Sequence, residues 1–212
     1  MKAFIFDMDG VIIDSEPLHF DVDMETMEHL GFKVTQNGLE KYVGMTNPAM
    51  WRLIRVEYGI KQTVEEIISY QLRRKIEELH ARDFAPMEGI ESLLAELKLR
   101  NLPIALASSS PRIFIEEVLR KFDIADYFAS IVSGEEVPSG KPAPDVYLEA
   151  ALQLGVSPAD CVVLEDSRNG VIAAKEAGMR CIGYINIHSG DQDLSRADWI
   201  VKAIKDIPLS QL

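Results

Sequence analysis

The chain has 212 residues, enough to bury one sizeable core or a core and a small second domain. Its hydrophobic fraction of 47% and charged fraction of 26% are those of an ordinary globular protein and exclude a disordered chain. The net charge of -12 argues against a basic face, which non-specific binding to nucleic acid or to an anionic membrane requires.

The sequence contains no run of about 18 apolar residues, and a strand begins at residue 2 without the charged and apolar regions of a signal peptide. We therefore expect a cytoplasmic protein, a monomer, that binds neither membranes nor nucleic acid. Cys161 and Cys181 lie beside apolar, strand-like residues, so we expect buried reduced thiols and no disulfide.

The first predicted element is a strand over residues 2–6, followed at once by two carboxylates. Phe4, Ile5 and Phe6 in succession are typical of a strand covered on both faces in a parallel sheet. Side chains two residues apart point the same way, so Asp7 and Asp9 should face one site. Two like charges held there destabilise the fold unless a cation or a shared proton relieves them. The pair indicates a metal or acid–base chemistry, although by itself it could also be a solvated acidic turn.

The next segment, residues 17 to about 82, shows only helical periodicity. Ser15 can cap a first helix with Pro17 in its first turn, and this helix should extend to Gly31. Apolar residues recur at helical spacing in three groups, namely Phe20, Met24 and Met27, then Met50, Leu53 and Ile54, and then Val64, Ile68, Leu72, Ile76 and Leu79. We therefore predict that residues 16–83 form an inserted, all-helical domain.

From residue 87 onward, apolar strands alternate with amphipathic helices, as in an α/β domain with a parallel sheet. The strands are predicted at 103–107, 130–133, 161–164, 180–184 and 199–201. The helices are predicted at 88–100, after Ser110 and Pro111, over 146–154 and at 168–177. Residues 1–15 and 84–212 should therefore form one α/β core domain, built on a doubly wound parallel sheet.

Two polar clusters at the ends of predicted strands are suited to phosphate, because open α/β sheets bind ligands at the carboxyl ends of their strands. Ser108 and Ser109 precede a helix, whose first amides and the serine hydroxyls can hold an oxyanion. Plain capping by Ser110 is the alternative. Lys141 lies in a loop before a helix, where an ammonium group can neutralise phosphate and a nearby aspartate together. A solvated surface lysine is the alternative there.

Another predicted strand ends in two acids, Glu165 and Asp166. Mg²⁺ is typically held by one or two carboxylates together with phosphate oxygen and water. Either acid could instead cap the helix that begins near Arg168. Because the four clusters fall in order along one sheet, we interpret them as one site.

With these motifs in place, the sequence resembles the phosphatase branch of the haloacid dehalogenase superfamily, which carries a helical cap inserted after the first strand. The resemblance covers the whole chain through Asp7 to Val11, Ser108, Lys141 with Pro142, and Glu165 with Asp166. It implies a Rossmann-like core at 1–15 and 84–212 and a helical cap domain at 16–83.

The resemblance also implies a role for each site residue. Asp7 would be the nucleophile and Asp9 the general acid and base. Phosphate would be bound by Ser108, Lys141 and the backbone amide of Ser109. Magnesium, for which Mn²⁺ or Co²⁺ can substitute, would be bound by Asp7, Asp166 and the carbonyl of Asp9, with Glu165 close by.

The second acid distinguishes between reactions. A protonated Asp9 can donate to a leaving alkoxide and later take a proton from the attacking water. Halide needs no proton to leave, and the true dehalogenases of the superfamily lack an acid at this position. The sequence therefore favours a phosphoric monoester hydrolase over a dehalogenase.

Within the branch, the segments 14–19 and 107–111 resemble sugar- and polyol-phosphate phosphatases. β-Phosphoglucomutase is the nearest alternative and shares a histidine matching His19, which could instead be a half-buried polar residue near a hinge. The mutase holds a second phosphate with basic cap residues, where this sequence has Val43 and Asn47. Arg52 and Arg55 follow one or two turns later. We therefore expect hydrolysis of phosphorylated carbohydrates.

A non-enzymatic phosphoacceptor switch, of the receiver-domain type, is a remote alternative. Receiver domains also combine an acidic cluster, a Ser or Thr and a Lys on a doubly wound sheet. Their acidic pair is adjacent, however, and they have no helical insertion.

Overall fold

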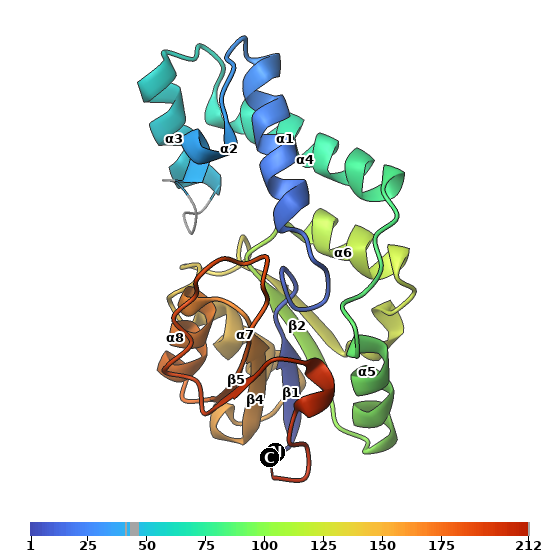
Figure 1. The fold of residues 1–212 in the computed structure, drawn as a ribbon. Helices are drawn as coiled ribbons and strands as arrows, with labels where there is room; N and C mark the ends of the chain where they lie inside the picture. Colours follow the sequence, from blue (N-terminus) through green and yellow to red (C-terminus); the bar gives the residue numbers. More distant parts are fainter. Residues whose placement is uncertain (41, 43–46, 212) are drawn as a thin grey trace. The chain divides into compact units, whose positions relative to one another are not determined.

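The computed structural model describes residues 1–40, 42 and 47–211, and the chain divides into two compact units. The larger unit is made of Met1–Asp14 and Phe84–Leu212, and the smaller unit is Ser15–Asp83. Ser15, predicted as the last residue of the first core segment, therefore belongs to the smaller unit. Figure 1 shows the strands in the larger unit alone.

The larger unit is built on a parallel sheet, which over the described residues has the strand order β3-β2-β1-β4-β5-β6. The strands are β1 (Ala3–Phe6), β2 (Ile104–Ser108), β3 (Ser130–Ser133), β4 (Cys161–Glu165), β5 (Arg180–Tyr184) and β6 (Trp199–Val201). The order reverses at β1, which pairs in parallel with β2 on one side and β4 on the other. This confirms the doubly wound sheet, and the reversal is where such sheets place their ligands.

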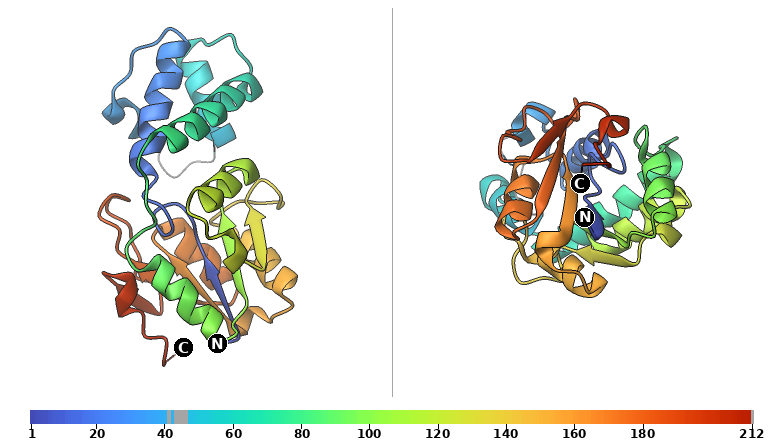
Figure 2. Two further views of the ribbon diagram at one scale, coloured as in Figure 1. Left: turned by 90° about the vertical axis from the view of Figure 1, so that its right-hand side faces the viewer. Right: turned by 90° about the horizontal axis from the view of Figure 1, so that it is seen from below.

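Helices cover both faces of the sheet (Figure 2). α5 (Ile90–Leu99) and α6 (Arg112–Lys121) lie on one face, and α7 (Asp145–Leu154) and α8 (Arg168–Glu176) on the other. Short 3₁₀ turns at Ala125–Tyr127, Pro158–Asp160 and Ile204–Asp206 complete the connections. Ala3 and Ile5 belong to the apolar core on the α7 and α8 side. Phe4 and Phe6 alternate with them and are equally buried, so β1 is covered on both faces as its sequence predicts.

The smaller unit is helical wherever the structure describes it. It comprises α1 (Glu16–His29), α2 (Gln36–Glu40), α3 (Asn47–Tyr58) and α4 (Val64–Ala81). Thr63 and Glu66 form a reciprocal capping box at the start of α4. Ser15 stands at the N-cap of α1, but contrary to the prediction its side chain does not cap the helix.

The buried faces of these helices differ from the predicted ones. In α3 Trp51 is buried and Leu53 is half exposed. In α4 the buried stripe is Val64, Ile67, Gln71, Lys75 and Leu79, so Ile68, Leu72 and Ile76 are only partly covered. The stripe is rotated because α4 packs against both α1 and α3, and polar side chains face α1 where Gln71 donates to Asp23.

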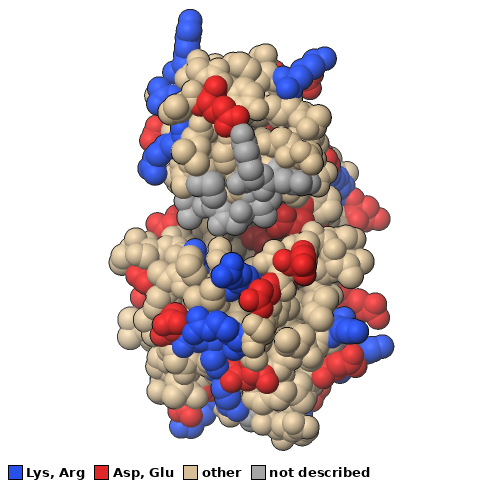
Figure 3. Space-filling model, turned by 60° about the vertical axis from the view of Figure 1, so that its left-hand side comes forward, with Lys and Arg blue, Asp and Glu red and all other residues tan. Residues whose placement is uncertain are grey.

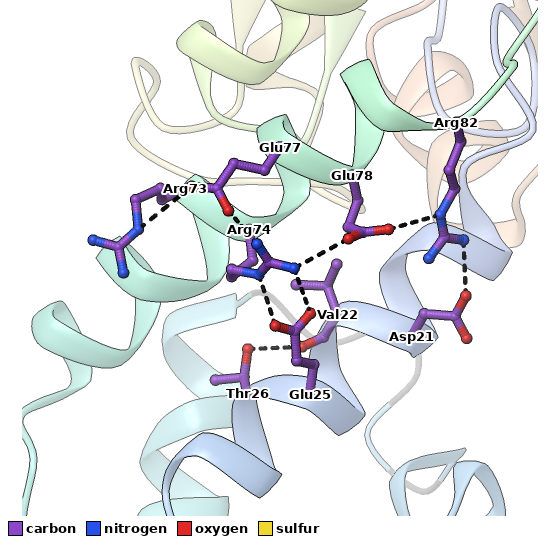
Figure 4. A network of polar contacts seen from close by, with 9 residues as sticks. All are labelled: Asp21, Val22, Glu25, Thr26, Arg73, Arg74, Glu77, Glu78 and Arg82. Atoms are coloured by element: carbon purple, nitrogen blue, oxygen red, sulfur yellow. Dashed lines mark hydrogen bonds and ion pairs between the residues drawn. The ribbon is translucent and has the colours of Figure 1, made fainter.

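α1 and α4 are joined by the network of polar contacts in Figure 4. Arg74 on α4 binds the carboxylate of Glu25 on α1 through Nε at 2.7 Å and Nη2 at 3.2 Å. Arg82 donates to Asp21 on α1 through Nη1 at 2.8 Å, and its Nε binds Glu78 on α4 at 3.0 Å. Bidentate arginine geometry fixes orientation, although each partly exposed pair adds only about 0–1 kcal/mol to stability. The contacts thus fix how α1 and α4 align.

Charged side chains of both signs lie on the surface, and the two cysteines are buried. Over the face drawn in Figure 3, Lys and Arg side chains are interspersed with Asp and Glu. None of the described helices is long and apolar enough to cross a bilayer. Cys161 and Cys181 are buried free thiols, as predicted, and burial raises the pKa of both.

Candidate active site

The candidate site lies at the carboxyl ends of β1 and β4. Phe6 is in register with Leu164, and the amide of Asp7 donates to the Leu164 carbonyl at 3.0 Å. Asp7, Glu165 and Asp166 therefore leave neighbouring strands at the same level. All three are buried carboxylates, with Asp7 6% and Asp166 4% exposed.

Lys141 supplies the balancing charge. Its Nζ lies 2.5 Å from Oδ1 of Asp7 and 2.8 Å from Oε1 of Glu165, and it also donates to the Ala107 carbonyl at 3.2 Å. The ammonium group lies 4.7 Å from the centre of the Tyr147 ring. The predicted surface-lysine alternative is therefore wrong, because this side chain is only 6% exposed.

Glu165 is held on both oxygens. Oε1 accepts from Tyr147 at 2.9 Å as well as from Lys141, and Oε2 accepts from the amide of Ser167 at 2.8 Å and its hydroxyl at 2.9 Å. A Cβ at Gly170 on α8 would fall 1.5 Å from Oε1, so the glycine makes room for the carboxylate. The cap of α8 is Ser167, whose hydroxyl accepts from the Gly170 amide, and neither predicted acid performs this role.

Burial and mutual repulsion change the proton affinity of this cluster. Burial, reinforced by Glu165 and Asp9 and opposed by Lys141, raises the pKa of Asp7 to about 8. Burial, together with repulsion from Glu165 and Asp7, raises the pKa of Asp166 well above its ordinary value. For Lys141, burial favours the neutral form, but the Asp7 and Glu165 carboxylates outweigh it and raise its pKa.

The cluster fits a hard divalent cation. Among the described residues, Asp7, Glu165 and Asp166 each offer an oxygen atom, and these atoms lie within 4.8 Å of one another. Carboxylate oxygens are the ligands that Mg²⁺ prefers, and one ammonium group cannot neutralise three acids. Gly10 brings its backbone against this cluster, because its φ is +78° and a Cβ there would lie 1.9 Å from Oδ2 of Asp166.

Asp9 lies with the serine loop that follows β2. Its Oδ2 accepts from the hydroxyl of Ser108 at 3.2 Å and from that of Ser110 at 2.8 Å. Ser108 in turn accepts from the Ser110 amide at 3.0 Å. Ser109 is exposed beside them, and Gly134 allows close approach, since a Cβ there would be 3.1 Å from the Ser109 Cα.

The structure thus brings together Asp7, Lys141, Glu165 and Asp166, and separately joins Asp9 to Ser108. His19 is half-buried on α1 and belongs to the smaller unit. Val43 lies outside the described residues, and Asn47 is the first residue of α3. Arg52 is exposed, and the buried Nε of Arg55 has no hydrogen-bond partner among the residues that the structure describes.

Several contacts of the cluster were not predicted, namely those of Ser110, Tyr147, Ser167 and Ser189. Ser110 was interpreted only as a cap, but α6 has Pro111 at its N-cap, and the hydroxyl of Ser110 binds Asp9. Tyr147 is buried on α7, and a tyrosine among buried apolar residues signals that its hydroxyl needs a partner. The hydroxyl of Ser189 donates to Oδ2 of Asp166, and no sequence pattern indicates this contact.

Comparison with known proteins places the chain in a family. The family model described as "Haloacid dehalogenase-like hydrolase" matches residues 4–184. Hexitol phosphatase B of Escherichia coli K12 is 40% identical over 85% of this chain and 82% of its own length. The β-phosphoglucomutase of Bacillus subtilis is 34% identical over 100% of this chain and 94% of its own.

The fold is also similar to that of a solved structure. CbbY from Rhodobacter sphaeroides, crystallised in complex with phosphate, superimposes with a TM-score of 0.88. It is 26% identical, and the match covers 98% of this chain and 96% of that one. Magnesium is typical of phosphatases of this family, and the buried acidic cluster is of the kind that binds it. The chain belongs to the haloacid dehalogenase-like hydrolase family and is an enzyme of the hydrolase class.

Proposed function

We propose that this protein is a magnesium-dependent phosphatase that hydrolyses sugar or polyol monophosphates through an aspartyl-phosphate on Asp7. The observation that carries the proposal is the buried cluster at the ends of β1 and β4, in which Asp7 lies 2.5 Å from Lys141 and beside Asp166. The similarity to a hexitol phosphatase supports the substrate class.

In the first half-reaction a carboxylate oxygen of Asp7 attacks phosphorus, and the bond from phosphorus to the sugar oxygen breaks. Lys141 holds the other Asp7 oxygen, so one oxygen is oriented while the second reacts. Ser108, Lys141 and the Ser109 amide are proposed to bind the phosphoryl oxygens. Magnesium, when bound, would neutralise the charge that develops on the transferred phosphoryl group.

Asp9 is proposed to move the protons. It donates one to the leaving sugar oxygen and, in the second half-reaction, takes one from the water that attacks the phosphorus of the aspartyl-phosphate. Phosphate leaves, and Asp7 is regenerated as a carboxylate. The hydroxyls of Ser108 and Ser110 hold Asp9 in the described structure, so phosphate binding at Ser108 would release the Ser108 contact.

Asp7, Asp166 and the carbonyl of Asp9 are proposed as the magnesium ligands, and Mn²⁺ or Co²⁺ as substitutes. Glu165 has both oxygens occupied by donors, so we assign it to positioning Lys141 beside the metal. His19 and the helical unit at 16–83 are proposed to form a cap over the substrate, which excludes water during transfer.

β-Phosphoglucomutase activity is the second candidate, favoured by the 34% identity to the Bacillus enzyme over the whole chain. A mutase must hold two phosphates, and basic residues are absent from the sequence at Val43 and Asn47. We therefore rank hydrolysis first.

The proposal is tested by measuring the release of inorganic phosphate from a panel of hexitol and sugar monophosphates, with Mg²⁺ or with excess chelator. Conversion of β-glucose 1-phosphate to glucose 6-phosphate is followed in parallel, with and without glucose 1,6-bisphosphate. The proposal predicts metal-dependent hydrolysis that the bisphosphate does not accelerate. Isomerisation much faster than any phosphate release would establish the mutase instead.

A further inference from the structure

The loop that follows β5 contacts the candidate cation site. Asp166 is almost fully buried, and its Oδ2 accepts a hydrogen bond from Ser189, which lies 23 positions later in the sequence. The same oxygen lies against Gly10, where a Cβ would approach to 1.9 Å. Oδ2 is therefore held between the Gly10 turn and the Ser189 hydroxyl.

The backbone of Ser189 is itself held by two hydrogen bonds. Its amide donates to the Asn186 carbonyl at 3.3 Å, and its carbonyl accepts from Nε2 of Gln192 at 2.8 Å. Oε1 of Gln192 accepts from the amide of Arg168 at 3.0 Å, two residues after Asp166. The loop is thus attached to the first residue of α8.

Asn186 attaches the other end of the loop to the segment after β1. It is 5% exposed, and its Nδ2 donates to the Gly10 carbonyl at 3.1 Å. Its Oδ1 accepts from the amide of His188 at 3.0 Å, which shapes the turn that presents Ser189. A buried amide with both groups paired is costly to disrupt, so the turn has a defined position.

We propose that Ser189 is a positioning residue for the metal site, holding one oxygen of Asp166 so that the other is directed at the cation. The inference rests on the proposed function only in taking Asp166 as a ligand. Carboxylate ligands are commonly held in this way by a second hydrogen bond, and loss of such a bond typically weakens metal binding about 10- to 100-fold. The loop is therefore part of the cation site although it contributes no ligand.

The test is the affinity of the protein for Mn²⁺, measured by electron paramagnetic resonance of the free ion, without substrate. Ser189→Ala should raise the Kd about 10- to 100-fold. Gln192→Ala, which frees the Ser189 carbonyl and leaves its hydroxyl, should raise it by a smaller factor. Ser195→Ala is the matched control, because Ser195 is an exposed serine in the same loop that bonds Asp193. Its Kd should be unchanged.

Circular dichroism and the melting temperature of the metal-free variants establish that each is folded. A folded Ser189→Ala protein with the native Kd overturns the inference, whatever the enzyme hydrolyses. Weakened Mn²⁺ binding in a protein that hydrolyses no sugar phosphate leaves the inference standing and overturns the proposed function. A Gln192→Ala effect as large as that of Ser189→Ala also overturns the inference, because Gln192→Ala leaves the Ser189 hydroxyl in place.

Discussion

Lys141 and Glu165 form an ion pair of 2.8 Å whose side chains are 6% and 1% exposed. A buried pair of this kind is weak evidence for stability, because removing both charges from water offsets much of their attraction. Its effect is geometric. Glu165 holds the Lys141 ammonium group at a point where that group also reaches Oδ1 of Asp7. The ammonium group is therefore positioned before any substrate binds.

Lys141→Ala should lower kcat about 10²- to 10³-fold, because it removes a preorganised donor to the phosphoryl group. It should also lower the free energy of unfolding by about 3–5 kcal/mol, since Asp7 and Glu165 lose their cation. Lys175→Ala is the control, because Lys175 pairs with Asp198 at a partly exposed position and should change stability by about 0–1 kcal/mol. Equal effects of the two substitutions on kcat and stability would contradict the assignment.

Metal binding should depend on pH. Burial raises the pKa of Asp7 from 3.8 to about 8 in the metal-free protein, so below pH 8 a cation must displace a proton. The Kd for Mg²⁺ should fall, by up to about tenfold per pH unit, as the pH rises toward 8. Calorimetric titrations between pH 6 and 8.5 measure it. An affinity that is constant over this range would be inconsistent with a protonated Asp7.

The stability of the metal-free protein should change in the opposite sense. Between pH 4 and 8 the folded protein retains a proton on Asp7 that the unfolded chain has lost, so the free energy of unfolding falls as the pH rises through this window. Thermal unfolding in chelator should show the fall, and saturating Mg²⁺ should diminish it. Asp7→Asn should have a smaller pH dependence in chelator than the native protein.

Gly170→Ala separates two opposing effects. Alanine in a helix is favoured over glycine by about 1 kcal/mol, but here its Cβ would lie 1.5 Å from Glu165 Oε1. The carboxylate must move, and overpacking of this kind destabilises by about 1–3 kcal/mol. We expect net destabilisation and a lower kcat. Gly38→Ala, with its nearest neighbour at 3.7 Å, should leave kcat unchanged and be neutral or stabilising. A Gly170→Ala enzyme as active and stable as the native one would show that Glu165 can be repositioned freely.

Tyr147→Phe keeps the ring beneath Lys141 and removes only the hydroxyl that donates to Glu165 at 2.9 Å. Loss of a hydrogen bond to a charged group should destabilise the fold by about 1.5–3 kcal/mol. Denaturant unfolding measures this, with Tyr127→Phe, on a partly exposed ring near Lys98, as the control. A change no larger than that of the control would contradict a role for the hydroxyl.

The sheet and its site positions could be predicted because β1 and β4 are apolar runs that end in acids, and parallel strands bring such ends together. The buried face of α4 in the smaller unit could not be predicted. Gln71 and Lys75 lie on that face, and a prediction from hydrophobicity places such polar residues on the exposed side. The partners of Glu165 and Asp166 were also missed. Tyr147 and Ser189 reach them from distant parts of the chain, and no spacing rule connects such positions.

The central claim is that Asp7 carries the phosphoryl group. The most direct measurement is acid quenching of the enzyme during turnover of a sugar monophosphate, followed by peptide mass spectrometry. We predict one phosphate on the peptide containing Asp7 in the native enzyme, a greater amount in Asp9→Asn if dephosphorylation is slowed more than transfer, and none in Asp7→Asn. Phosphate on a different residue, or native turnover by Asp7→Asn, would contradict the account.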